Sequence, residues 1–226
     1  MHLPGSIAAI DSSRKQGAAP SESLVYSATD KESSLIPALP ETLLRLELLC
    51  GQETLDLESA AIVVASDLGA TIRVLQLAAQ ECELQLSRIY ECVAAIGKLG
   101  LRLLVDSSPV GLTALQTRFL DHCRTVAEAA RTVAPGFPGV AQDDAYLAGL
   151  FHELDAMPQI FSDWRLTKEM DQSREKVVEY LAVNWSLPIF ARGLRPVSLK
   201  ANHYADLVAT VVAVAHEVVK LEQSVP

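Results

Sequence analysis

The sequence contains a histidine followed at once by a glutamate, His152-Glu153, directly after the apolar run AYLAGLF at residues 145–151. Imidazole nitrogens and carboxylate oxygens are the groups with which proteins bind divalent metals and activate water. Two more histidines, His122 in FLDHCRTVAEAA and His216 in VAVAHEVV, lie in segments of helical composition. The first question is whether the fold brings these side chains together.

Short catalytic motifs do not answer that question. In HELDA, residues 152–156, Ala156 occupies the position of the second histidine of an H-E-x-x-H zinc motif, so a zincin-type protease is excluded. The sequence also lacks a phosphate-binding G-x-x-x-x-G-K-[ST] loop, a dinucleotide-binding G-x-G-x-x-G turn and a G-x-S-x-G nucleophile elbow. Any chemistry must come from residues that are distant in sequence.

Composition and charge narrow the class of protein. Half of the 226 residues are hydrophobic, which is enough for a sizeable core, and the formal net charge of -9 argues against nucleic acid or an anionic membrane as a partner. Four cysteines, at 50, 82, 92 and 123, are scattered without a C-x-x-C pair, as expected for reduced thiols. No secretion signal precedes them, and the longest apolar stretch, residues 208–219, is too short to span a bilayer. A cytoplasmic location is predicted.

The chain is expected to form an all-α fold after a flexible leader. Residues 1–34 are rich in Ser, Ala and Gly without helical or strand periodicity, whereas helix-forming residues dominate from residue 35 onward. A proline and a glycine within residues 106–112, between helical runs, predict a boundary between an amino-terminal helical subdomain, 35–108, and a second helical subdomain, 109–226.

Local signals predict where individual helices begin and end. In the first subdomain, one helix has Pro40 in its first turn and ends at Gly51, and another runs from an Asp56 cap to Gly69. A further helix is expected over ATIRVLQLAAQ, residues 70–80, and the next is capped by Ser87 and followed by a short step between Gly97 and Gly100. In the second subdomain, helices are expected over 113–134, after a cap at Asp143 or Asp144, after a cap at Ser173, and over about 201–222.

The order of several short motifs resembles the HDOD domain, a catalytically degenerate branch of the HD phosphohydrolase superfamily. IPALPETLLRLELL resembles the proline-flanked first helix of that family, and ASDLGATIRVLQLAAQ its SDP-x-L-x-x-x-L-L-x-x-A-N segment, with Gly69 where proline is usual. RIYECVAAIGKLGLRLL is similar to the I-x-x-A-I-x-x-L-G step, AYLAGLFHELDAMP to A-F-x-A-G-L-L-H-D-I-G, and NWSLP to W-G-L-P. The similarity covers residues 35 to 220.

This resemblance implies an HDOD-like architecture, in which an amino-terminal helical bundle packs on an HD-like bundle, and it implies a degraded active site. His122 and His152 match two histidines of a working HD site, but Glu153 replaces the aspartate of the His-Asp pair and His216 stands where a later aspartate is usual. Leu194 and Arg195 occupy the region where many relatives place a histidine pair. No metal or cofactor is therefore expected, and if one binds, its predicted ligands are His122, His152 and Glu153.

The function implied is that of a non-catalytic regulatory or signal-transduction module that binds a protein partner in trans, with a small ligand or nucleotide as a second kind of occupant. The remnant pocket, His122, His152, Glu153 and His216, and Arg73 as an anion contact from the first bundle, are its predicted site residues. An alternative is an active metal-dependent phosphohydrolase acting on a nucleotide or cyclic dinucleotide, in which Glu153 and Asp155 replace the lost carboxylate. An all-α domain that binds a small ligand without ancestral chemistry is a third interpretation. The oligomeric state is not predicted.

Overall fold

The structure, a computed structural model, describes residues 36–81, 88–108, 111–161, 174–188 and 203–223. The chain divides into two compact units, Met1–Ser33 and Ser34–Pro226, and all described residues belong to the second. These residues form helices and the segments that join them, with no strand among them, so the predicted all-α class is confirmed. None of the helices in these ranges combines the length and apolar character needed to cross a membrane.

The first three helices follow most of the local signals. Helix α1 is Pro40–Gly51, as predicted, and α2, Leu57–Ala65, is capped by Asp56, whose side chain accepts hydrogen bonds from the backbone of Glu58 and Ser59. The prediction that this helix continues to Gly69 was wrong, because α3 is Leu68–Glu81 and begins at a second cap. There, the Asp67 carboxylate accepts the Ala70 N–H at 3.0 Å.

Helix α4, Ile89–Ser107, is interrupted at Gly97 but continues through Gly100. Gly97 has φ 57° and ψ -163°, a conformation that glycine adopts readily, and it kinks the helix. The kink lies at the first of the two glycines between which a short step was predicted. The predicted cap Ser87 lies outside the described residues, and Arg88 occupies the N-cap position.

The second half of the chain begins with two helices that pack closely on each other. Helix α5, Ala114–Val133, starts with a capping box in which Thr113 and Gln116 satisfy each other's backbone N–H groups. Helix α6, Gln142–Leu150, has Ala141 at its N-cap and so begins earlier than either predicted cap, Asp143 or Asp144, would place it. Asp143 and Asp144 do not cap it because each binds another side chain: Asp143 pairs with Arg131 and Asp144 accepts the Tyr204 hydroxyl.

The remaining helices are a short α7, Met157–Ile160, then α9, Arg174–Asn184, and α10, His203–Gln223. The predicted final helix is thus confirmed, whereas the predicted cap Ser173 and the residues 193–198 lie outside the described residues, as does the leader 1–34. The proposed division between 35–108 and 109–226 stays a prediction.

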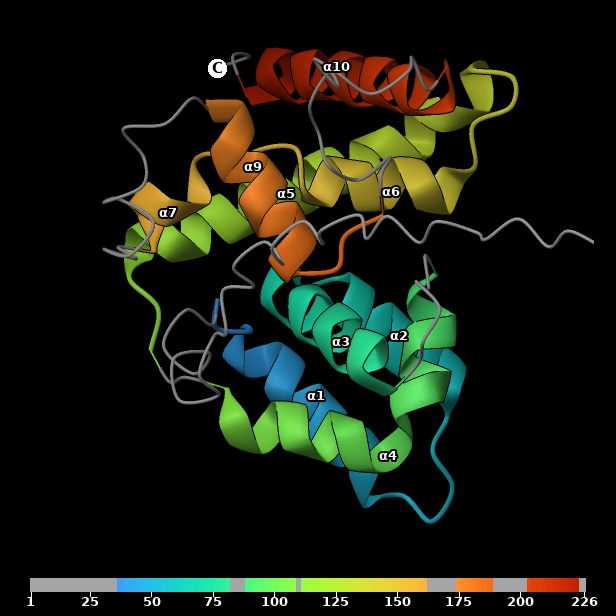
Figure 1. Cartoon of the computed structure of the whole chain (residues 1–226), viewed down its shortest axis with the longest axis vertical. Helices are drawn as coiled ribbons and strands as arrows, with labels where there is room; N and C mark the ends of the chain where they lie inside the picture. The colour runs from blue at the N-terminus through green and yellow to red at the C-terminus, as the bar shows by residue number, and fades with distance from the viewer. Residues whose placement is uncertain (1–35, 82–87, 109–110, 162–173, 189–202, 224–226) are drawn as a thin grey trace, which may run out of the picture. The chain divides into compact units, whose positions relative to one another are not determined.

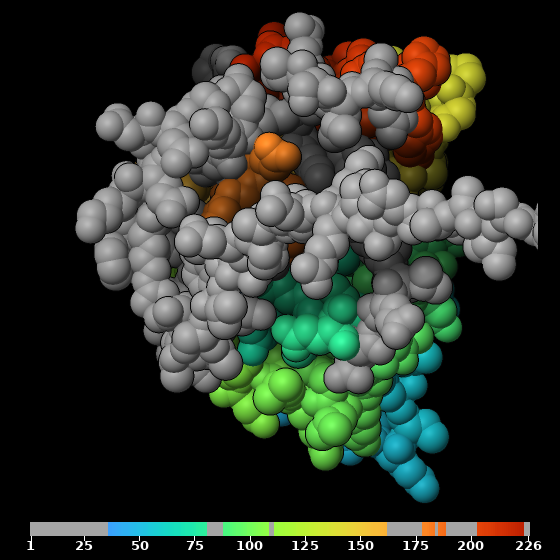
Figure 2. All heavy atoms as spheres, viewed as in Figure 1, coloured from blue at the N-terminus to red at the C-terminus, as the bar shows by residue number. Residues whose placement is uncertain are grey.

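Two buried clusters hold the helices together. The larger contains residues of α1 to α7 and α9 and continues from Leu46 of α1 to Trp185 after α9. The smaller consists of valines and alanines where α10 packs on α5 and α6, an arrangement visible in Figure 1. In Figure 2 the side chains of α4 are visible at the surface, without other helices covering them. Leu99 of this helix is 81% exposed.

Candidate metal centre

His122, His152, Glu153 and His216 lie together, although they come from three parts of the sequence. His122 is in the middle of α5, His152 and Glu153 are in the turn directly after α6, and His216 is on α10. Each offers one donor atom, and these four atoms all lie within 4.8 Å of one another. Helix α10 packs along α5 and α6, which explains how a residue 64 positions beyond His152 reaches the same point.

The three imidazole rings form a nearly equilateral triangle. Their centroids are 5.1 Å apart for His122 and His152, 5.3 Å for His122 and His216, and 5.0 Å for His152 and His216. Nε2 of His152 is 3.3 Å from Nε2 of His122, and each of these nitrogens is 3.9 Å from Oε1 of Glu153. The donors therefore converge on one point, and the rings do not stack on one another.

A backbone hydrogen bond fixes the orientation of His152. Its Nδ1 lies 2.7 Å from the carbonyl oxygen of Gly149, and a carbonyl can only accept, so Nδ1 carries the proton. In the neutral ring, Nε2 is then the unprotonated nitrogen, and its lone pair is available toward His122. Ligating histidines of metal sites are usually held this way, with the other ring N–H donated to a carbonyl or carboxylate.

Burial favours the uncharged form of His152 and His216. The His152 side chain is 7% exposed, and burial lowers its pKa to about 4, with the neighbouring His122 and His216 rings acting in the same direction. Burial also lowers the pKa of His216, as does the nearby Lys220. On α5, burial and then Glu153 raise the pKa of the Cys123 thiol, so this cysteine is a neutral part of the core.

Close packing of α5 and α6 determines the distance between the histidines. A Cβ atom on Gly149 would lie 2.7 Å from Cα of Ala127, so the two helices approach as closely as they do because residue 149 has no side chain. After α6, Phe151 and Leu154 are almost completely buried and hold the turn between them in place. His152 and Glu153 are therefore presented from a turn that is anchored on both sides.

The donor set fits a transition metal better than magnesium or calcium. Three imidazoles and one carboxylate are ligands typical of Zn²⁺ and of iron, nickel and copper, whereas Mg²⁺ and Ca²⁺ prefer oxygen donors. In a tetrahedral zinc site with bonds of about 2.0–2.1 Å, neighbouring ligand atoms are about 3.4 Å apart. The separation of 3.3 Å between His122 and His152 matches this value, and the Glu153 oxygen would have to move about 0.5 Å closer.

The sequence matches one known protein family over most of its length. The sequence model of the HDOD domain matches residues 36–191, more than half of the chain. The chain belongs to the HDOD domain family. No curated protein gives a significant match.

Solved structures share the HDOD fold of this chain. One crystal structure of the MmoQ response regulator from Methylococcus capsulatus strain Bath, covering fragment 20–298, has a TM-score of 0.64 at 14% identity, with 85% of this chain and 87% of that chain covered. A second structure of MmoQ has a TM-score of 0.59 at 13% identity, with 81% and 87% covered. At this identity the likeness establishes the fold alone, and it agrees with the predicted HDOD-like architecture.

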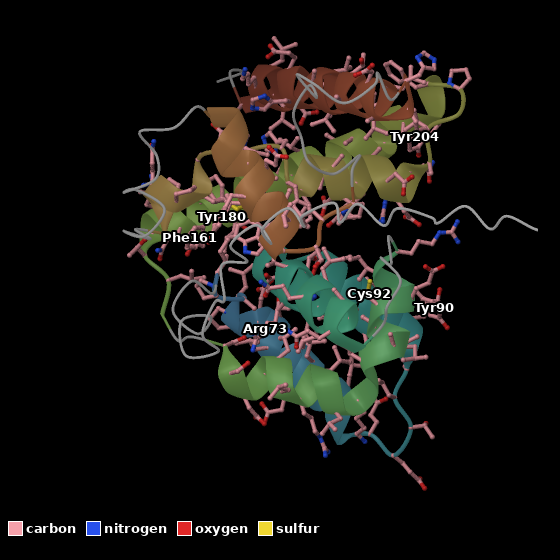
Figure 3. The ribbon with its side chains drawn as sticks, viewed as in Figure 1. Arg73, Tyr90, Cys92, Phe161, Tyr180 and Tyr204 are labelled. Carbon is pink, nitrogen blue, oxygen red and sulfur yellow. The ribbon has the colours of Figure 1, made fainter. Side chains whose placement is uncertain are left out.

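In this HDOD domain the four predicted pocket residues lie together, whereas Arg73 lies outside their cluster. Arg73 donates a hydrogen bond to Ser107 of α4 at 3.2 Å and lies among the amino-terminal helices (Figure 3), away from α10. Its predicted role as an anion contact stays a prediction. His216 was not among the ligands predicted for a metal, but its position in place of the family's aspartate was the signal that could have included it. Gly149 matches the glycine of the motif A-F-x-A-G-L-L-H-D-I-G, but its role in helix packing was not predicted from that match.

A second feature of this HDOD domain is an open pocket of about 820 Å³ between the amino-terminal helices and the HD-like helices. Its lining comes from α2, the start of α4, α5 and α6, and includes Tyr146, whose hydroxyl donates to the Ala65 carbonyl at 2.9 Å. Four acidic residues and two arginines also line it: Glu58, Glu91, Glu128, Asp143, Arg88 and Arg131. Arg131 already pairs with Asp143 at 3.0 Å and lies over the Tyr146 ring, so the pocket is acidic overall.

Proposed function

We propose that this chain is a non-catalytic regulatory module of a signalling pathway that acts by binding a protein partner in trans. The observation that carries the proposal is the composition of the HD positions: three histidines and one glutamate, with aspartate at neither carboxylate position. In a working HD site, a second carboxylate normally helps to hold the catalytic metal and its water. Here a third imidazole takes that position, so no residue of the cluster can act as the second carboxylate. The fold is shared with the MmoQ response regulator and is compatible with such a role.

Hydrolysis of a phosphodiester tests this proposal against its alternative. The chain, loaded separately with Mn²⁺, Fe²⁺ or Zn²⁺, is expected to cleave bis(p-nitrophenyl) phosphate no faster than the His122→Ala and His152→Ala variants. The alternative, a metal-dependent phosphohydrolase, is favoured by one observation, the convergence of all four side chains. Turnover by the unmodified chain that both variants abolish would establish the alternative and reject the non-catalytic role.

The acidic pocket between the two groups of helices is the surface we propose for the partner. Its volume suits several side chains, its lining contains Ala61, Ala65 and Leu147, and Ile62 and Tyr90, which also line it, are 65% and 51% exposed. Because acidic side chains outnumber arginines around it, the expected partner segment carries basic and apolar residues. A small ligand or nucleotide would instead need several cations that are free of carboxylate partners, and of the two arginines in the lining Arg131 is paired with Asp143.

Site-specific photo-crosslinking in the native host tests the partner surface. A p-benzoylphenylalanine at Ile62, in the pocket lining, is expected to yield an adduct with one protein through a segment rich in Lys or Arg. The same residue placed at Leu99, which is also exposed but lies on α4 outside the pocket lining, serves as the control. Equal adducts at both positions, or none at Ile62, would reject this surface as the partner site.

A further inference from the structure

We infer that His122, His152, Glu153 and His216 form a closed, four-ligand transition-metal site that fastens α10 to α5 and to the turn after α6. The inference rests on the proposed non-catalytic function, to which it adds a means of regulation. It differs from the expected ligand set, which included His122, His152 and Glu153 and left His216 as a pocket residue. The geometry gives His216 an equal place, because its ring is as close to the other two rings as they are to each other.

The number of protein ligands decides what such a metal could do. Catalytic zinc sites leave one coordination position for water or substrate, whereas structural sites are filled by four protein ligands. In this chain the fourth donor is His216, which converges with the other three within 4.8 Å. A metal held by all four would have no vacant tetrahedral position, so its effect would be on structure and not on hydrolysis.

The element that the metal would control is α10. Its contact with α5 and α6 consists of small apolar side chains, among them Val211, Ala215 and Val219 against Val126 and Ala148. Small side chains remove little apolar surface from water, so this interface is weak for a 21-residue helix. Tyr204 (Figure 3) adds polar contacts near the start of α10, where its hydroxyl donates to Asp144 and accepts the Ala141 N–H at 3.3 Å.

His216 lies in the second half of α10, one turn before the last buried valine of the interface. A metal bond at this point would hold the half of the helix that Tyr204 does not reach. Among the described residues, loss of the metal would leave α10 beyond residue 204 attached mainly through valines and alanines, and its detachment would expose the apolar surface of α5 and α6. Metal occupancy would therefore determine which surface the module offers to a partner.

Cobalt substitution and thermal unfolding test this site without reference to activity. The chelator-treated full chain is titrated with Co²⁺, whose visible absorption distinguishes four-coordinate from six-coordinate sites, and is then unfolded by heat with and without Zn²⁺. We expect one equivalent of four-coordinate Co²⁺ and a higher Tm with Zn²⁺. His216→Ala is expected to lose affinity for Zn²⁺ by more than about tenfold, together with the Tm increase. His203→Ala, at the exposed first residue of the same helix, is expected to behave like the unmodified chain.

A second variant covers the case in which His216→Ala does not fold. His216→Asp keeps a donor at residue 216, so it is expected to bind Co²⁺ with a shifted absorption spectrum. No binding of Co²⁺ or Zn²⁺ by the unmodified chain, or binding that neither substitution at residue 216 alters, would overturn the inference. Either result would leave the non-catalytic proposal intact. Phosphodiester turnover by the metal-loaded chain would reject that proposal and also the closed coordination, because a hydrolytic metal needs a vacant position for water.

Discussion

At the scale of single residues, two aspartates perform the same task in different surroundings. Asp56 caps α2 at the surface, whereas Asp67, which caps α3, is only 1% exposed. The Asp67 carboxylate accepts the Ala70 N–H and also the Leu39 N–H at 2.6 Å, so it joins the start of α3 to the segment before α1. A buried N–H without a partner costs far more than one that faces water.

Replacing each aspartate by alanine should separate the two environments. Asp67→Ala leaves two backbone N–H groups without their acceptor in the core, and it is expected to lower the free energy of unfolding by about 2–4 kcal/mol. Asp56→Ala is expected to cost clearly less, because water can replace the lost acceptor. Urea denaturation followed by circular dichroism measures both values, and an equal cost for the two substitutions would contradict this account.

Tyr146 gives the chain a pH dependence in the alkaline range. Burial raises its pKa to about 12, and its hydroxyl donates to the carbonyl of Ala65. In the unfolded chain a tyrosine ionises near pH 10, so the folded state keeps a proton that the unfolded state releases. This contribution to stability is complete below pH 10 and is lost as the pH rises toward 12, by about 2–3 kcal/mol for a shift of this size.

Tyrosinate absorbance and unfolding free energies measured between about pH 9 and pH 12 test this assignment. In a Tyr204→Phe background, which removes another tyrosine whose pKa is raised, the chain should show a late ionisation step that Tyr146→Phe removes and that Tyr90→Phe, at a half-exposed tyrosine, retains. The unfolding free energy of Tyr146→Phe should also fall less steeply over this range. A late step that persists in Tyr146→Phe would assign the raised pKa to another residue.

At the scale of helices, the packing of α5 against α6 depends on Gly149. Gly149→Ala would place a methyl group 2.7 Å from Cα of Ala127, a backbone atom that cannot move without shifting α5. The expected result is a loss of about 1–3 kcal/mol of stability, as for other overpacked cores, and a weaker metal site because His122 and His152 separate. Gly136→Ala is the matched control, since nothing lies within 4 Å of its added Cβ. Chemical denaturation and Zn²⁺ titration of the two variants measure both effects.

Helices whose termini carry local signals could be predicted from the sequence, and those determined by tertiary contacts could not. Asp56 and Thr113 cap neighbouring backbone groups, and the helices after them begin where the sequence indicates. Asp143 and Asp144 are residues of the type that caps helices but bind Arg131 and Tyr204, partners 12 and 60 residues away, so the local rule failed there. The predicted histidine cluster came from the family resemblance. Its triangular geometry depends on how α10 lies on α5, which no local pattern specifies.

At the scale of the whole molecule, one question is whether the amino-terminal and carboxy-terminal helices fold as separate units, as the predicted boundary near residue 108 implies. The larger buried cluster argues against independent folding, because it continues from Leu46 of α1 to Trp185 after α9. A core shared by both groups of helices couples their stabilities, and a defect at one end should then be felt at the other.

Leu46→Ala tests this coupling with a probe, Trp185, in the carboxy-terminal part of the same core. Trp185, 5% exposed, reports unfolding by fluorescence once Trp164 is replaced by phenylalanine, while circular dichroism reports all helices. Leu46 is fully buried, so its truncation should cost about 2–5 kcal/mol and move both transitions to the same lower denaturant concentration. Leu44→Ala, in the same helix but 57% exposed, should change stability by less than about 0.5 kcal/mol. If the Trp185 transition stays in place while part of the circular dichroism signal shifts, the two groups of helices unfold separately, and the partner pocket between them would then open without unfolding either group.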